Sequence, residues 1–421
     1  MEYKKIDMGA YNLHLINTNK FKTITMEINF REKITKENIT KRNILKAVLL
    51  NSNRSFPKER DLIKETENLY DLKLLSSNTR IGNYSNLSFK IRFLNEKYTE
   101  ESMNEYSISF LLDILFNPDI ENDSFKKDNI NKCKNKIEKN IKSLKDNKLK
   151  YTLIKLLSTT KNKPYSYNSY GYIEDLEKIN EKNLYEYYKK MLNENYIDIF
   201  VVGEINEENI KKIIKEKFIV NSYKKIKKDI LINELTSKKI TKIIEKDKAN
   251  QTQLTILCNL KNITEWERKY VLLVYNELLG GSSNSLLFDT VREKNSYAYY
   301  INSTTKPYDN TLMIYSGIEP GNSEEVIKLI KKTLQNLTKS LFEDKALESA
   351  KETIISSIKS SKDSPTGIIN TYYAKELFNS KIFEERIENI SKIKKEDIVN
   401  LSKKIHINTI YILEGEKNER D

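Results

Sequence analysis

The sequence predicts an α+β fold built from two similar halves, and two observations support this. First, residues 141–146 (IKSLKD) recur as residues 358–363 (IKSSKD), an offset of 217 residues counted from Ile141 to Ile358, and Phe125 and Phe342 have the same spacing. Second, both halves run in the same order of strands and helices and end in a strand. At 421 residues the chain is also longer than one hydrophobic core usually serves, about 250–300 residues.

In the first half, Ile24, Met26, Ile28 and Phe30 alternate with polar residues, as in a half-buried strand. The same period of two recurs further on, and an almost wholly apolar run precedes Gly203 and indicates a closing strand. Longer stretches between these strands predict helices. The predicted elements are strands over residues 22–30, 86–94 and 197–202 and helices over residues 40–50 and 125–144.

The second half repeats this plan after a lysine-rich, weakly periodic stretch that we interpret as a connector. Its predicted strands cover residues 251–260, 311–317 and 409–413, the last stopped by Gly415. The expected organisation is therefore a domain over residues 1–219, a linker over residues 220–237 and a second domain over residues 238–421.

Residues 278–299 form the most informative motif. An apolar helix ends at Gly280 and Gly281, where a glycine pair is a typical helix stop. A short polar turn and a second helix carrying Arg292 follow, and Tyr299 comes seven residues later in a tyrosine-rich strand. An arginine and a tyrosine held near one another can donate hydrogen bonds to a peptide backbone.

This motif resembles the C-terminal half of M16 (insulinase-like) zinc peptidases over more than twenty positions. The resemblance implies two homologous domains of the M16-type (LuxS/MPP-like metallohydrolase) fold, each an antiparallel-rich sheet covered by helices. It also implies that Arg292 and Tyr299 bind substrate and support the transition state, reaching a peptide held at a zinc site.

The zinc motif of that family, His-x-x-Glu-His on the first helix, is absent here. Asn43 and Ala47 stand where the two ligands are expected, and Lys46 stands in place of the general base. None of these three side chains can perform those roles. We therefore expect no metal or other cofactor in this chain and no peptidase activity from it alone.

No other residues restore a metal site. The only histidines, His14 and His406, are far apart, and each is interpreted as structural or as a surface residue. Glu138 is a candidate for the family's third ligand, although a solvated helix charge is the simpler interpretation. Cys133 and Cys258 show no metal-binding spacing and predict no disulfide framework.

The net charge of +13 would suit binding to nucleic acid or a membrane surface, but acidic residues are interspersed among the lysines. A composition biased towards isoleucine, lysine and asparagine explains the charge more simply, so neither partner is expected. No signal-peptide core and no apolar run of about 18 residues occur, which predicts a cytoplasmic location.

A chain that keeps the arginine and tyrosine but lacks zinc ligands resembles the non-catalytic subunit of a heterodimeric M16 peptidase. The expected partners are a zinc-bearing M16 homologue and a peptide or small-protein substrate. The bacterial subfamily associated with aminopentanol modification of elongation factor P is similar. The glycine-rich loop of the mitochondrial processing peptidase is absent. The alternative is a non-peptidase scaffold that docks a protein-modification or peptide-maturation partner.

Overall fold

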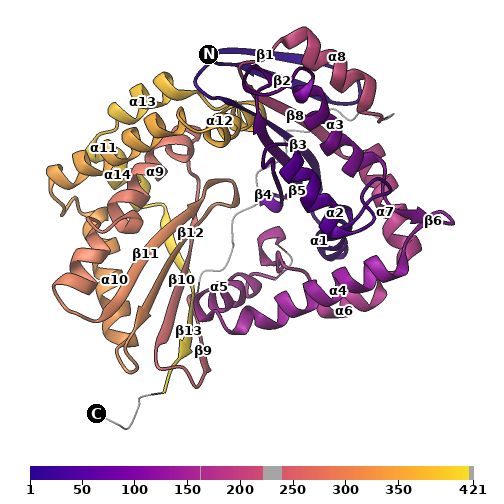
Figure 1. The fold of residues 1–421 in the computed structure, drawn as a ribbon. Helices are drawn as coiled ribbons and strands as arrows, with labels where there is room; N and C mark the ends of the chain where they lie inside the picture. The colour runs from indigo at the N-terminus through magenta and orange to yellow at the C-terminus, as the bar shows by residue number, and fades with distance from the viewer. Residues whose placement is uncertain (162, 221–238, 417–421) are drawn as a thin grey trace. The chain divides into compact units, whose positions relative to one another are not determined.

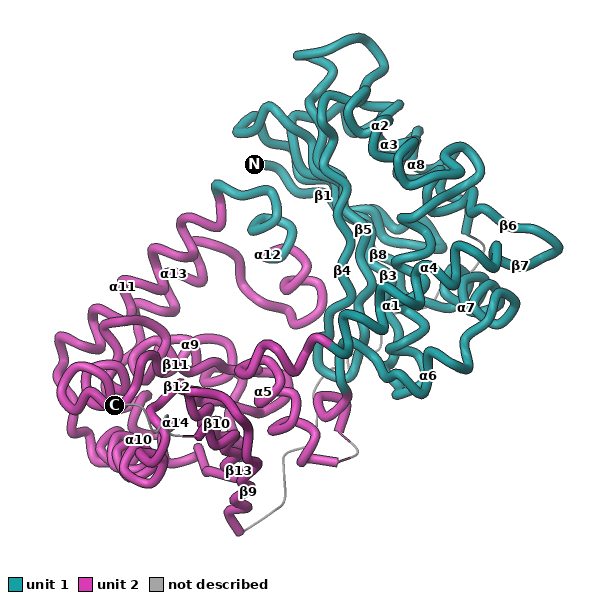
Figure 2. The backbone as a smooth tube through the Cα atoms, turned by 60° about the horizontal axis from the view of Figure 1, so that its bottom comes forward, with its two compact units in different colours: residues 1–142, 168–229, 363–370 teal, residues 143–167, 230–362, 371–421 magenta. Residues whose placement is uncertain are grey.

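The computed structural model of the chain describes residues 1–161, 163–220 and 239–416 (Figure 1). It divides into two compact units (Figure 2). Unit 1 contains residues 1–142, 168–229 and 363–370, and unit 2 contains residues 143–167, 230–362 and 371–421. Apart from Val220, the predicted linker over residues 220–237 lies outside the described residues.

Unit 1 is built on a six-stranded sheet of order β1-β2-β8-β3-β5-β4. Strands β2 and β8 are parallel, and all other neighbours are antiparallel. Its central strand β3 is almost entirely buried. The strands are β1 (Glu2–Asp7), β2 (Asn12–Asn17), β3 (Thr23–Lys33), β4 (Lys73–Ile81), β5 (Tyr84–Leu94) and β8 (Tyr196–Gly203), beside a small hairpin of β6 (Ile120–Glu121) and β7 (Ser124–Phe125).

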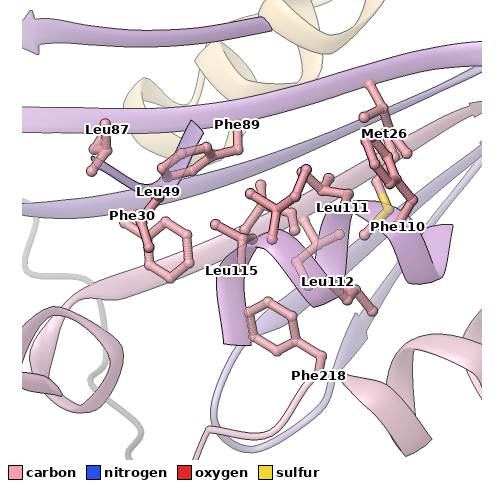
Figure 3. Close-up of a cluster of buried hydrophobic side chains, with 14 of the residues drawn as sticks. Met26, Phe30, Leu49, Leu87, Phe89, Phe110, Leu111, Leu112, Leu115 and Phe218 are labelled. Atoms are coloured by element: carbon pink, nitrogen blue, oxygen red, sulfur yellow. The ribbon is translucent and has the colours of Figure 1, made fainter. Parts of the chain in front are cut away.

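Helices α1, α3, α7 and α8 pack against this sheet, while α4 and α6 pack onto α1. The main core lies between the sheet and α3, where Phe110, Leu111, Leu112 and Leu115 meet buried residues of β3 and β5 (Figure 3). The helices of unit 1 are α1 (Lys36–Asn51), α2 (Glu59–Asn68), α3 (Met103–Phe116), α4 (Lys127–Lys142), α6 (Ile173–Lys178), α7 (Glu181–Glu194) and α8 (Glu207–Lys217).

Unit 2 has a five-stranded sheet of order β11-β12-β10-β13-β9. Strands β9 and β13 are parallel, and the other neighbours are antiparallel. Its central strand β10 is buried at every residue. The strands are β9 (Thr241–Lys246), β10 (Thr252–Leu260), β11 (Ala298–Lys306), β12 (Thr311–Ile318) and β13 (Ile405–Glu414).

Helices α9 and α5 pack against the strands of this sheet, and α11 packs on α9 and α13. Three π-helical segments, η4, η5 and η6, flank or follow α9. The helical elements are α5 (Lys148–Ser158), η4 (Glu267–Val271), α9 (Leu272–Asn276), η5 (Glu277–Gly281), η6 (Phe288–Glu293), α10 (Ser323–Thr338), α11 (Asp344–Ser361), α12 (Pro365–Phe378), α13 (Phe383–Ser391) and α14 (Lys395–Ser402).

The two sheets have the same topology. The order β2-β8-β3-β5-β4 in unit 1 corresponds strand by strand to β9-β13-β10-β12-β11 in unit 2, and each has one parallel pair at the equivalent place. Helices α4 and α11 begin at Lys127 and Asp344, which are also 217 residues apart (127 to 344). The predicted α+β fold of two similar halves is therefore confirmed, and β1 is an addition to the first half.

Each unit also includes helical residues from the other half of the sequence. Helix α5 lies within the predicted first domain but packs in unit 2, where Leu156 joins a core with Leu257, Met313 and Tyr411. The equivalent α12 begins 217 residues after α5 (148 to 365), and its first turns cluster with unit 1. There the Lys90 ammonium donates to the Thr366 hydroxyl at 3.3 Å. The predicted domain boundary at residue 219 does not describe this exchange of α5 and of the start of α12 between the two units.

The eight strands and helices predicted in the two halves all occur within a few residues of their expected bounds. Strands β1, β4 and β9 and the β6–β7 hairpin were not predicted. In the part of the chain that the structure describes, no helix has both the length and the apolar content needed to cross a membrane.

Candidate functional site

Arg292 lies in η6, and its guanidinium is partly free to bind a ligand. The side chain is 45% exposed, and its Nε is 4.0 Å from the Glu293 carboxylate, a distance at which an exposed pair contributes little. Asp289 pairs instead with Lys294 at 2.6 Å. The guanidinium carbon lies 4.8 Å from the centre of the Phe288 ring, a cation–π contact that positions it.

Tyr299 lies on β11, the edge strand of the unit 2 sheet, at an irregularity in the pairing. Ala298 pairs with Ile318 while Tyr300 pairs with Gly317, so Tyr299 is an extra residue in the ladder. Such a bulge redirects a side chain, and Tyr299 is 56% exposed. Because η6 packs against β11, the structure brings the elements that carry Arg292 and Tyr299 together.

The glycine pair allows η5 to approach β11 closely. A Cβ on Gly280 would lie 2.9 Å from the backbone nitrogen of Ser303, which is too short for a contact with rigid backbone. A Cβ on Gly281 would mainly meet the carboxylate of Glu277, which can move. Gly280 is therefore the residue that fixes the spacing between the helical layer and the strand of Tyr299.

We expect Gly280→Ala to lower the free energy of unfolding by about 1–3 kcal/mol, because an added methyl group overpacks this contact. Urea denaturation followed by circular dichroism measures the change. Gly281→Ala serves as the matched control and should cost less, since its clash is with a movable side chain. Equal costs for the two variants would contradict this explanation.

Thr35 is the N-cap of α1, and its hydroxyl accepts a hydrogen bond from the backbone N–H of Asn38. Asn43, which the sequence analysis places at the first of the degenerate zinc positions, is 7% exposed. Its amide donates to the Ser169 carbonyl at 2.9 Å and accepts from Asn78 at 3.1 Å. The amide oxygen and nitrogen of Asn43 are thus both engaged within unit 1.

Lys46 and Ala47, which the sequence analysis places at the other two degenerate positions, line a cavity of about 560 Å³ between α1 and α4. Neither offers an imidazole or a carboxylate, so this part of α1 does not fit a zinc ion. Across residues 1–161, 163–220 and 239–416, no three histidine, cysteine, aspartate or glutamate side chains are grouped as a metal would require.

We expect the purified chain to retain no stoichiometric zinc, because a protein zinc site needs three or four ligand side chains and α1 supplies none. Metal analysis by mass spectrometry after dialysis against zinc-free buffer provides the measurement. One equivalent of zinc retained per chain would contradict the interpretation of α1.

His14 is a structural residue at the centre of a buried polar cluster in unit 1. It is fully buried, its Nε2 lies 3.2 Å from Asp198, and its Nδ1 lies 2.9 Å from the Tyr3 hydroxyl. Arg31 lies 3.4 Å from the other Asp198 oxygen. Burial alone would raise the pKa of Asp198, but the His14 hydrogen bond and the Arg31 charge hold it below its usual range.

The remaining candidate metal ligands do not form a cluster among the described residues. His406 is exposed on β13, and Glu138 forms an i,i+4 pair with Lys142 at 2.6 Å and does not line the cavity beside Lys46. Cys133 and Cys258 are buried and free, and burial raises the pKa of their thiols to about 11 and about 12. Neither cysteine therefore has the character of a reactive thiolate.

Sequence reasoning missed three lysines of α4 that line the same cavity, Lys132, Lys136 and Lys139. Their spacing of four and then three residues places them on one face of the helix, and this was the available signal. In so lysine-rich a chain that spacing is not distinctive on its own, because which helix face meets α1 depends on the tertiary fold.

The chain is similar to several known proteins. Residues 178–354 match the family model described as the peptidase M16 inactive domain. A solved structure of a peptidase M16 inactive domain from Pseudomonas fluorescens has a TM-score of 0.80 at 16% identity, covering 99% of this chain and 98% of that one. The chain has the M16 fold. A conserved protein from Enterococcus faecalis V583 is similar over 100% of both chains, with a TM-score of 0.92 and 24% identity.

Two sequence relatives of this M16-like chain come from Bacillus subtilis (strain 168). A probable inactive metalloprotease, YmfF, is 28% identical over 414 residues, covering 97% of this chain and 96% of that protein. An uncharacterized zinc protease, YmxG, is 26% identical over 363 residues, covering 82% and 84% respectively. One relative is thus described as inactive and the other as a zinc protease.

Proposed function

We propose that this chain is the non-catalytic subunit of a heterodimeric M16 zinc peptidase. In this proposal a separate zinc-bearing M16 homologue cleaves a peptide or small protein, and this chain contributes Arg292 and Tyr299 to substrate binding. The observation that carries the proposal is the contrast between the two units. The zinc positions of α1 hold Asn43, Lys46 and Ala47, whereas Arg292 and Tyr299 stay exposed on adjoining elements.

In the proposed mechanism, this chain only binds and orients the peptide substrate. The Arg292 guanidinium would donate hydrogen bonds to a substrate carbonyl oxygen, where negative charge develops during peptide hydrolysis, and the Tyr299 hydroxyl would donate a further one. Arg292 lies on the π-helical segment η6 and Tyr299 on the bulged strand β11, so both are carried by elements of the packed unit. The zinc and the general base would come from the partner.

The relatives support a separation of substrate binding and zinc catalysis between two subunits. One bacterium carries both a probable inactive metalloprotease and an uncharacterized zinc protease that resemble this chain. A pair of this kind would supply the two parts of the proposed enzyme. The cytoplasmic location and the link to aminopentanol modification of elongation factor P stay predictions from the sequence.

Assembly is the first test. The chain is mixed with a His-x-x-Glu-His homologue from the same organism, and size-exclusion chromatography with light scattering measures the mass of the complex. The proposal expects a 1:1 complex. If the two proteins elute separately at micromolar concentrations, this pairing is wrong. A complex that forms but leaves the partner's peptidase activity unchanged would favour the scaffold alternative.

A further inference from the structure

The cavity beside Lys46 is a basic pocket built entirely within unit 1. It has a volume of about 560 Å³, within the range of about 300–1,000 Å³ typical of ligand sites. Helices α1, α2 and α4 and strand β4 form its walls. The lining residues are Lys46, Ala47, Leu50, Asn51, Glu59, Ser76, Lys132, Cys133, Asn135, Lys136, Ile137, Lys139 and Asn140.

Positive charge is in excess in this pocket. Four lysines line it against one carboxylate, Glu59, which is 2.8 Å from Lys132. Among the described residues, no carboxylate lies within ion-pair distance of Lys46, Lys136 or Lys139, although ion pairs are frequent elsewhere on the surface. Three ammonium groups are therefore available to an anion that enters the pocket.

Lys46 is the inner member of this group. It projects from α1 at the position where the family motif would place the catalytic glutamate, and it is partly buried. Burial lowers the pKa of its ammonium group, and no charged neighbour contributes to that shift. A bound anion would offset the lost hydration and stabilise the charged form.

The walls of this pocket offer both charge and apolar surface. Its lysine ammonium groups can donate charge-assisted hydrogen bonds to a carboxylate. Ala47, Leu50 and Ile137 add apolar surface that would suit the aliphatic part of a peptide side chain.

We propose that this pocket binds a carboxylate of an acidic peptide, with Lys46 and Lys136 as its ammonium ligands. Lys46, at the helix position where the family motif has its glutamate, would then bind a negatively charged group of the peptide. Its use as a substrate anchor rests on the proposed function, whereas carboxylate binding is a property of this chain alone. A test on the isolated chain therefore separates the two claims.

Fluorescence anisotropy with an N-terminally labelled Ala-Leu-Glu-Glu peptide tests the proposal. The affinity of the chain should fall about ten- to hundredfold in Lys46→Met and in Lys136→Gln, since each removes one charge-assisted contact. Lys46→Arg keeps the charge and should retain binding. Lys127→Gln, on α4 but outside the pocket, is the matched control and should bind like the wild type.

Peptide variants identify the source of the carboxylate. Loss of binding on amidation of the C-terminus assigns the terminal carboxylate, and loss on replacing both glutamates with glutamine assigns a side chain. Inorganic phosphate should compete only at far higher concentration than the peptide. The proposal is overturned if the amidated glutamine peptide binds as tightly as the acidic one, or if Lys46→Met and Lys136→Gln both keep wild-type affinity.

Discussion

Replacing Arg292 with alanine is expected to reduce peptide cleavage by the assembled pair about 10²–10³-fold, the usual effect of removing one oxyanion-type donor. The side chain is 45% exposed, and its contact with Phe288 positions the guanidinium without enclosing it. Its contribution should therefore appear when a substrate carbonyl gains negative charge. Initial rates with a fluorogenic peptide, measured at saturating partner, provide the test.

Two controls separate this catalytic effect from a structural one. Tyr299→Phe deletes a single hydroxyl on β11 and should produce a smaller loss of the same kind. Lys294→Ala removes the same charge two residues from Arg292 but only breaks an exposed pair with Asp289, so the rate should stay near wild type. An Arg292→Ala chain that assembles and supports wild-type cleavage would point to the scaffold function.

Replacing Arg42 with alanine is expected to lower the free energy of unfolding by about 3–5 kcal/mol, the cost of removing one partner of a buried ion pair. Arg42 is completely buried on α1. Its guanidinium lies 2.8 Å from the Glu32 carboxylate and donates to the Asn195 amide oxygen at 2.9 Å. It also donates to the backbone carbonyl of Phe30. The substitution would remove the guanidinium from all three acceptors and leave the Glu32 carboxylate with the Tyr187 hydroxyl but without its cationic partner.

Urea unfolding monitored by circular dichroism measures this loss. The double variant Arg42→Met with Glu32→Gln removes both charges and should be less destabilised than Arg42→Ala, because no buried charge is left unpaired. Lys41→Ala, a neighbouring residue on α1 that is only partly buried, is the control and should change stability far less. A loss below about 1 kcal/mol in Arg42→Ala would contradict the role assigned to this residue.

Strands and helices whose apolar residues recur at a regular spacing could be predicted from the sequence. Ile24, Met26, Ile28 and Phe30 alternate because one face of β3 meets the helices, and all four are fully buried. Strand β4 was not predicted because it is an edge strand in which no residue is fully buried, so its sequence has little apolar alternation. The repeat could be read from the α4 and α11 sequences even though the strands themselves share little.

Asp198 shows why local patterns could not identify the buried polar cluster. It is a charged residue in an otherwise apolar strand, which from the sequence alone is only an interruption. Its partners, His14 and Arg31, lie on β2 and β3, far away in the chain. Only the order of strands brings the three residues together and makes the buried charge favourable.

Only part of the candidate site could be predicted from the sequence, because the rest again depends on residues that are far apart in the chain. The spacing of Arg292 and Tyr299 could be read directly, but the bulge that redirects Tyr299 depends on pairing with β12. Likewise, the amphipathic pattern of α5 does not reveal that it covers β10 and β13 in unit 2. Which sheet a helix covers, and which lysines line a pocket, depend on contacts between distant segments.

The most direct test of the central claim is the peptide-cleavage rate of an equimolar mixture of this chain and its zinc-bearing homologue, compared with each protein alone. Our account predicts no cleavage by this chain, little by the homologue, and a mixture rate far above the sum of the two. Cleavage by this chain alone that is abolished by a zinc chelator, or a mixture no faster than the homologue alone, would contradict it.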